Sequence, residues 1–210
     1  MLPVDVKEFI ERYIDKITES EFETVYDKAL HASLGIYNVG QLTEALLQAG
    51  IDPLQSLSEV PALYLDGAEQ VTSISLPPNI LRIKKAGLAF ANIEIIMMPE
   101  HCELSEGCFR GSNVKRVKIP AIMNEVPEEC FYGCNNLHTV DLGDIEQIAS
   151  EAFAHCTSLQ DIVIPDTIEY ISSSAFDYCF NVCFIVSADN EYAINYAQKH
   201  NIKLKVVDRV

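Results

Sequence analysis

The sequence predicts an α+β protein, a solenoid of short parallel strands that is preceded by a small all-helical N-terminal domain. Two observations carry this prediction. Strand-like runs of one form return every 21 to 23 residues from Val71 onward. Residues 1–55 show no such repeat and place their apolar side chains at helical spacing. We therefore expect two domains, residues 1–55 and residues 56–210.

The N-terminal segment predicts three helices. The apolar residues of the first recur on one helix face: Val6, Phe9, Ile10, Tyr13, Ile14 and Ile17. Ser20, with Glu23 three residues later, forms a capping box at the start of the second helix. Asn38 can cap the third, which runs through Leu46 and ends at Gly50.

Two roles fit these helices. The open end of a solenoid exposes apolar core and unpaired strand, and a helical cap covers both. Three helices are more than a cap requires, so the alternative is an independent docking or oligomerisation module, which would make the protein a homo-oligomer. The sequence leaves both roles open.

The repeat is plain in five consecutive runs. Each reads apolar, two variable residues, apolar, one variable, apolar, and then Pro or Gly. The runs are VTSISLP from Val71, IEIIMMP from Ile93, VKRVKIP from Val114, LHTVDLG from Leu137 and LQDIVIP from Leu159. Alternation with period two points the apolar members inward and the variable ones outward. One unit is too small to bury its own apolar side, so stacked units must share a core.

A large apolar or aromatic residue recurs once in each coil. The residues at this place are Leu65, Phe90, Phe109, Phe131, Phe153 and Phe176. The last four stand in tight-turn sequences, CFRGS, CFYGC, AFAHC and AFDYC. Because they hold the same place in successive coils, we expect these four rings to stack in one buried column.

The repeat also carries a resemblance. Residues 159–179, LQDIVIPDTIEYISSSAFDYC, follow the pattern L-x-x-I-x-I-P-x-x-I-x-x-I-x-x-x-A-F-x-x-C almost throughout. From about residue 57 to residue 207 the chain resembles the BspA-type (Treponema-type) leucine-rich repeat, including its closing segment of a short helix and a last strand. The resemblance implies a right-handed leucine-rich-repeat solenoid that serves protein recognition and has no catalytic residues.

Charge and composition bear on partners and location. The formal net charge is −16 and the pI about 4.6, so phosphate backbones and anionic membranes would repel the chain. No apolar run has the length of a signal-peptide core or of a membrane span. We therefore expect a cytoplasmic protein that binds neither nucleic acid nor membrane, with its seven Cys reduced.

No residue pattern predicts a metal, a cofactor or a catalytic centre. Five Cys fall at two places of the repeat, Cys108 and Cys130 at one, and Cys134, Cys156 and Cys179 at the other. Small thiols suit the tight turns of a coil, whereas Cys183 fits neither column. His155 adjoins Cys156, but neighbouring residues point apart, and neither a phosphate loop nor HExxH is present. We expect no enzyme.

The outward strand positions form the candidate binding face. Neighbouring strands lie ~4.8 Å apart, so outward side chains of successive coils adjoin. An apolar pair beside a basic pair is typical of a recognition surface, unless a loop or the N-terminal helices cover it. The residues expected to bind a partner are Ile95, Met97, Arg116, Lys118, Thr139, Asp141, Asp161 and Val163.

The sequence thus predicts a non-enzymatic module that binds another protein through this face. The basic stretch RGSNVKRVKIP is expected to pair laterally with Asp141 and acidic neighbours. The alternative function is that of a structural or assembly component, for instance of a phage or a large bacterial complex, that associates with itself through the N-terminal helices.

Overall fold

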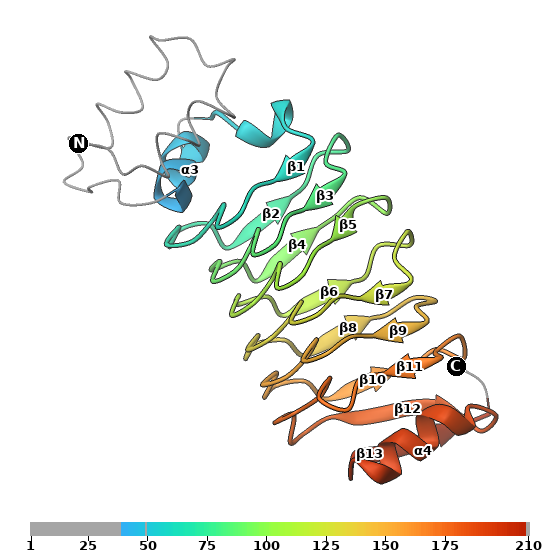
Figure 1. Cartoon of the computed structure of the whole chain (residues 1–210). Coiled ribbons are helices and arrows are strands. Elements are labelled where there is room, and N and C mark those ends of the chain that lie inside the picture. The colour runs from blue at the N-terminus through green and yellow to red at the C-terminus, as the bar shows by residue number, and fades with distance from the viewer. Residues whose placement is uncertain (1–38, 49, 209–210) are drawn as a thin grey trace.

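The computed structural model describes residues 39–48 and 50–208. In this part of the chain, short coils stack into an elongated solenoid between α3 (Val39–Gln48) and α4 (Glu191–Lys199) (Figure 1). The helices expected before residue 39, and with them the docking or oligomerisation role, lie outside the described residues. Within the described ranges, no helix is both long and apolar enough to cross a lipid bilayer.

The strands that the repeat predicts form one line of parallel strands. A four-stranded sheet has the order β2-β4-β6-β8, and a three-stranded sheet continues it as β10-β12-β13. The strands are Ser73–Ser75 (β2), Ile95–Met97 (β4), Arg116–Lys118 (β6), Thr139–Asp141 (β8), Asp161–Val163 (β10), Cys183–Ser187 (β12) and Lys203–Val207 (β13). In β6, β8 and β10 the central residue is buried and both its neighbours are exposed. The predicted alternation and the predicted solenoid are therefore confirmed.

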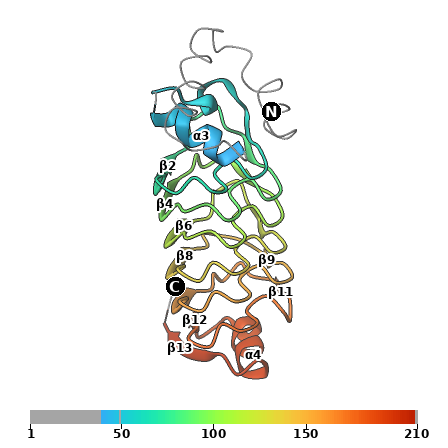
Figure 2. The ribbon, with the colours of Figure 1, turned by 90° about the vertical axis from the view of Figure 1, so that its left-hand side faces the viewer.

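Each repeat coil also contributes a second, shorter strand that the sequence analysis does not predict. These strands pair in parallel as β1-β3-β5 and β11-β9-β7. They are Glu59–Val60 (β1), Arg82–Ile83 (β3), Glu103–Leu104 (β5), Glu125–Val126 (β7), Gln147–Ile148 (β9) and Tyr170–Ile171 (β11). Figure 2 shows β9 and β11 on the opposite side of the coils from β2 to β8. The solenoid therefore has two strand-bearing sides.

A column of aromatic rings runs through the core, as predicted. The rings of Phe109, Phe131, Phe153 and Phe176 stack in turn at centroid distances of 5.2, 5.4 and 5.2 Å, with planes at most 14° apart. The first three rings are fully buried, and Phe176 is 6% exposed. Phe184 ends the column: its ring lies edge-on to that of Phe176, and the two ring centroids are 5.0 Å apart. The column joins the last repeat coils to the C-terminal cap.

The N-terminal end of the column differs from the prediction. Phe90 is 57% exposed, and Leu88 fills the buried place two residues earlier. The Leu88 N–H donates to the Cys108 carbonyl at 2.7 Å, which is the bond that the column Phe residues make to the next coil. By the same pattern the first coil uses Tyr64 rather than Leu65. The turn geometry therefore selects the residue two positions before Phe90 in one coil and one position before Leu65 in the other.

Two left-handed residues, four positions apart, shape the turn of most coils. The pairs are Leu63 and Gly67, Ala86 and Phe90, Gly107 and Gly111, Glu129 and Gly133, and Glu151 and His155. A residue with a side chain rarely adopts positive φ, so the second place of the pair often falls to glycine. At Gly111 an added Cβ would lie 2.8 Å from the ring of Phe90, which packs against this turn from the preceding coil. Where the second place holds a side chain, that side chain projects from the turn.

An asparagine ladder runs beside the turns. The Asn113 side chain donates to the Oδ1 of Asn92 at 2.7 Å and accepts from the Nδ2 of Asn136 at 3.1 Å. The signal was present in the sequence, because an Asn stands directly before the first apolar residue of three runs. Each bond joins one coil to the next and opposes sliding between them.

The described N-terminal cap is α3, which confirms the third predicted helix. Leu42 and Leu46 are buried in the same core as the first coil. Gly40 lies so close to that coil that an added Cβ would be 2.0 Å from the Asp66 carbonyl oxygen. The helix is followed by Gly50 at φ +81, and a 3-10 helix, Pro53–Ser56, leads into β1. α3 therefore covers the open end of the solenoid.

The C-terminal cap is formed by β12, α4 and β13, as the resemblance implies. Asn190 caps α4, since its side chain accepts from the Ala193 N–H at 3.0 Å and donates to the Pro165 carbonyl at 3.1 Å. The first of these bonds starts the helix, and the second ties it to the loop after β10. Tyr196 donates its hydroxyl to the Ser172 carbonyl at 2.8 Å, which holds the helix against the last repeat.

Candidate protein-interaction surface

The eight residues expected to bind a partner all lie exposed on one side of the solenoid. We call the outward side chains of β2, β4, β6, β8 and β10 the strand face. The register of the parallel strands places Ser73 beside Ile95, Ile95 beside Arg116, and Arg116 beside Thr139. Lys118 is aligned with Asp141 in the same way. Short strands in parallel register therefore turn separated positions of the sequence into one continuous surface.

The most unusual feature of the strand face is an exposed apolar pair. Ile95 is 60% and Met97 62% exposed, and their partners on β2 are the exposed Ser73 and Ser75. No described loop or helix covers them. Two adjacent exposed apolar side chains beside a charged group suit contact with a partner.

The basic pair on β6 differs from the expectation. The Lys118 ammonium contacts the Glu100 carboxylate rather than Asp141. This hydrogen bond raises the pKa of Lys118 and lowers that of Glu100, whose carboxylate also accepts the Ala121 N–H at 3.1 Å. The basic stretch therefore pairs with acidic neighbours as expected, Lys115 with Glu94 and Lys118 with Glu100, but Lys118 forms no ion pair with Asp141, because the loop after β4 brings Glu100 to it.

Arg116 is the free cation of the strand face. Among the residues that the structure describes, it takes part in no ion pair. It lies beside Ile95 in register. An apolar pair with an adjacent unpaired guanidinium can contact both an apolar side chain and an acidic group of a partner.

The C-terminal end of the strand face, formed by β8 and β10, carries less unpaired charge. Asp161 on β10 accepts from Lys205 of β13 at 2.5 Å. Val163 is 42% exposed, and Asp141 accepts the Gly143 N–H of its own turn at 3.1 Å. Thr139 is exposed between these charges and the basic pair.

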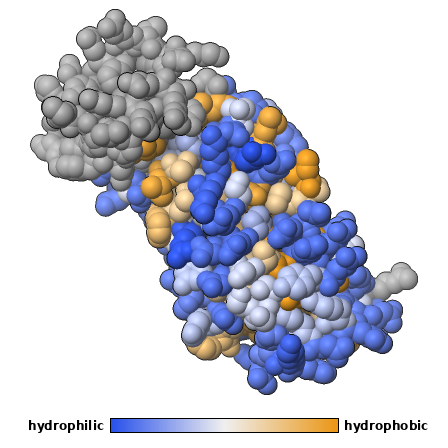
Figure 3. Space-filling view, viewed as in Figure 1, coloured by the Kyte–Doolittle hydropathy of each residue, from blue (hydrophilic) through white to orange (hydrophobic). Residues whose placement is uncertain are grey.

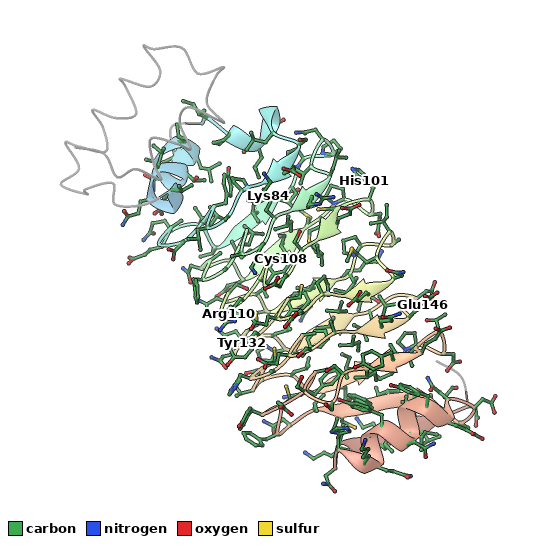
Figure 4. All side chains as sticks on the ribbon, in the orientation of Figure 1. Lys84, His101, Cys108, Arg110, Tyr132 and Glu146 are labelled. Atoms are coloured by element: carbon green, nitrogen blue, oxygen red, sulfur yellow. The ribbon has the colours of Figure 1, made fainter. Side chains whose placement is uncertain are left out.

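The second line of strands presents a different surface, which the sequence analysis missed. Arg82 on β3 donates to Glu103 at 2.9 Å and lies 3.6 Å from Glu59. Lys84 lies 2.7 Å from the other oxygen of Glu59 (Figure 4). The signal is a repeated pair of an outward residue and an inward apolar residue, which follows the Pro or Gly that ends each strand-like run. These ion pairs link neighbouring coils, so along β1, β3 and β5 this surface stabilises the stack rather than offering free charge.

The buried Cys have a structural role in the coil. The thiols of Cys134, Cys156 and Cys179 donate to the carbonyls of Phe109, Phe131 and Phe153 at 3.0, 3.1 and 3.0 Å. Each bond reaches back to the preceding coil. Burial raises the pKa of Cys134 to about 12 and that of Cys179 to about 11. Neutral, hydrogen-bonded thiols are poor nucleophiles and poor metal ligands.

The remaining Cys and His follow the same pattern. The sulfur atoms of Cys108 and Cys130 lie 3.5 Å apart in the core. Cys183, which fits neither column, is buried on β12 and shows no function here. His155 projects from its turn and stacks on Tyr178, away from the buried Cys156. In the described part of the chain, no three His, Cys, Asp or Glu side chains gather as a metal site.

These observations define a class, a leucine-rich-repeat solenoid with one open strand face. The model of the BspA type leucine rich repeat region matches residues 59–183 in six copies. This match spans more than half of the chain, and the protein belongs to the BspA-type leucine-rich-repeat family. No curated protein sequence matches the chain.

Solved structures share this fold. A leucine rich cell surface protein from Faecalibacterium prausnitzii A2-165 is 26% identical with a TM-score of 0.55, and the match covers 60% of this chain and 34% of that one. The pneumococcal vaccine antigen PcpA is 20% identical with a TM-score of 0.55, and the match covers 65% and 37%. The chain thus spans about a third of the length of these two proteins.

These comparisons correct one expectation and leave another untested. The expected cytoplasmic location is wrong, because the relative at 26% identity is described as a cell surface protein. Neither relative's description names an enzymatic activity. The absence of enzymatic activity stays a prediction.

Proposed function

We propose that the protein binds another protein at the cell surface through the strand face, with Ile95 and Met97 at the centre of the contact. The single observation that carries this proposal is the exposure of these two apolar side chains, at 60% and 62%, on a solenoid whose other large apolar side chains are mostly buried. Interface anchors are apolar groups that lose their contact with water on binding and lie near the centre of the contact.

The charges around this pair favour a partner with an acidic patch. Arg116 has no ion-pair partner among the described residues, so its guanidinium keeps its full capacity for a carboxylate. Lys118 is already held by Glu100 and adds little. Arg116 would orient the partner and accelerate encounter, an effect that salt weakens.

The other side of the solenoid is less suited to this role. Figure 3 contrasts the two ends of the solenoid rather than its two sides: apolar groups gather mainly over the N-terminal half, and the C-terminal coils present a largely hydrophilic surface. The ion pairs of Arg82 with Glu103 and of Lys84 with Glu59 would have to break before those groups could bind a partner. Thr139, Asp141 and Asp161, with the apolar Val163 beside them, would form the rim of the proposed contact.

Site-specific photo-crosslinking tests the proposal. A p-benzoylphenylalanine at position 97 is compared with the same group at Gln147, which is exposed on β9. Illumination of cells that carry the native partner should join one protein to position 97 and leave position 147 without a product. Crosslinking at Gln147 but not at Met97 would overturn the proposed face.

A further inference from the structure

A row of aromatic side chains follows the turn edge of the C-terminal coils. The Tyr132 and His155 rings lie 5.1 Å apart, and those of His155 and Tyr178 lie 4.3 Å apart and stack. Phe180 continues the row, 6.3 Å from Tyr178 and 77% exposed. The left-handed turn places put His155 and Tyr178, both at φ 62, on this edge. The row therefore follows from the repeat and is separate from the strand face.

One end of this row already binds a cation of the protein itself. The Arg110 guanidinium lies over the Tyr132 ring at 4.3 Å and pairs with the Glu129 carboxylate. Figure 4 shows Arg110 and Tyr132 together on this edge, opposite the edge that carries His101 and Glu146. An aromatic face and a carboxylate together hold a positive charge here.

The other end of the row opens into a cavity of 340 Å³ between the last repeat and the C-terminal cap. The cavity lies between the turn of residues 173–182 and the end of α4 with the start of β13. Its aromatic lining consists of Phe176, Tyr178, Phe180, Tyr196 and His200. A space of this size suits a small ligand or one side chain of a partner.

The cavity also holds a carboxylate without a counterion. Asp177 lines it, and among the described residues no Lys, Arg or His lies within ion-pair distance of Asp177. Burial, with the Asp177 charge second, raises the pKa of the Tyr196 phenol. Burial chiefly, and the same charge in part, raises the pKa of Cys179 to about 11. The negative field of Asp177 therefore reaches the groups around the cavity.

We propose that this cavity binds an organic ammonium group, held by the exposed rings of Tyr178 and Phe180 and by the carboxylate of Asp177. The chemistry repeats the pairing of Arg110 with Tyr132 and Glu129 at the other end of the row. The chain's net charge of −16 draws cations toward it. Lys203 at the cavity is exposed and is not paired with Asp177, so its long side chain can extend into water as the ligand enters.

Amide NMR titration of the full chain tests the proposal. The probes are n-butylammonium chloride, the uncharged 1-butanol as its match in shape, and sodium chloride as the salt control. Only the ammonium should shift amide signals of residues 173–182 and 196–203 in a saturable way. A lysyl tripeptide with blocked ends forms a further arm. Equal affinity for amine and tripeptide would identify a free amine as sufficient, and tighter binding of the tripeptide would identify a protein segment as the source.

Four variants separate this site from its alternatives. Asp177→Asn and Phe180→Ala should each weaken binding of n-butylammonium by about two- to fivefold, the range of one exposed cation–π contact or charge pair. Phe90→Ala removes another exposed ring, far from the cavity, and should not change the affinity for n-butylammonium. Lys203→Ala should leave binding unchanged or tighten it, because it removes a competing positive charge.

Three results would overturn the proposal. Wild-type protein that shows no saturable shift with n-butylammonium has no such site. Equal shifts with 1-butanol would make the cavity apolar rather than cation-selective. Loss of binding in Lys203→Ala with retention in Asp177→Asn would identify the recognised group as an anion.

Discussion

The aromatic column makes the sharpest stability prediction, for the change Phe153→Ala. The Phe153 ring is fully buried and stacks on both neighbours, on Phe131 at 5.4 Å and on Phe176 at 5.2 Å. Removing a buried Phe ring costs about 3–5 kcal/mol of unfolding free energy, including the cavity left behind. Two lost stacking contacts, at roughly 0.5–1.5 kcal/mol each, place this site toward the upper end. Because each coil touches only its neighbours, the loss weakens two coil interfaces at once.

Urea unfolding followed by circular dichroism measures this loss, and hydrogen exchange locates it. Phe180→Ala serves as the control, since it removes a ring that is 77% exposed and should change stability by at most about 0.5 kcal/mol. Amide protection should fall first in residues 131–179, on both sides of the space left by the removed Phe153 ring. A loss under about 1 kcal/mol in Phe153→Ala, or equal losses in the two variants, would refute the column as a main source of stability.

Three further predictions concern the turns, the ladder and the thiols. Gly143→Ala, where an added Cβ meets nothing within 4 Å, should cost only the left-handed strain of about 1 kcal/mol, whereas Gly111→Ala should cost more because its Cβ would lie 2.8 Å from a ring; thermal unfolding of the pair gives the difference. Asn113→Ala should lose about 1 kcal/mol in urea unfolding, because it removes two side-chain bonds between coils. Burial raises the pKa of Cys134 to about 12 in the folded protein, whereas an unfolded thiol has a pKa of about 8.5, so the unfolded thiol ionises first. The free energy of unfolding should therefore fall as pH rises from about 8.5, by up to roughly 1.4 kcal/mol per pH unit. The urea midpoint of Cys134→Ala should fall less steeply between pH 8 and pH 10 than that of the native chain, and an identical slope would contradict the burial effect.

The strand positions and the ring column could be predicted because each rests on a strict period. Val117 and Val140 hold the same place in successive coils, and their burial follows from that place alone. The second line of strands escaped because two residues per coil, such as Gln147 and Ile148, are too few to show alternation. Phe90 was misplaced because the sequence marks the aromatic residue, whereas the left-handed φ of 58 there sends the ring outward.

The electrostatic detail of the site could not be predicted for a physical reason. Lys118 is aligned with Asp141 in the sheet, yet its ammonium contacts Glu100 of the loop after β4. The conformation of a loop decides which carboxylate a long side chain can reach, and the repeat pattern does not predict that conformation. The cavity near Asp177 likewise joins the last repeat to the cap, two segments that no period relates.

The most direct test of the central claim is the affinity of the crosslinked partner for a double variant of the strand face. Met97→Asp places a charge at the apolar centre of the strand face, and Arg116→Glu reverses the charge of its cation. Because both side chains are exposed, the changes do not disturb the core. The control, Tyr170→Asp with Gln147→Glu, places charge on two exposed, aligned residues of the second line of strands. Binding through the strand face predicts at least about a hundredfold weaker Kd in the first variant, an unchanged Kd in the second, and a thermal transition of the first within a few degrees of the native chain. Wild-type affinity in the strand-face variant, with loss in the control or on removal of residues 1–38, would contradict the claim.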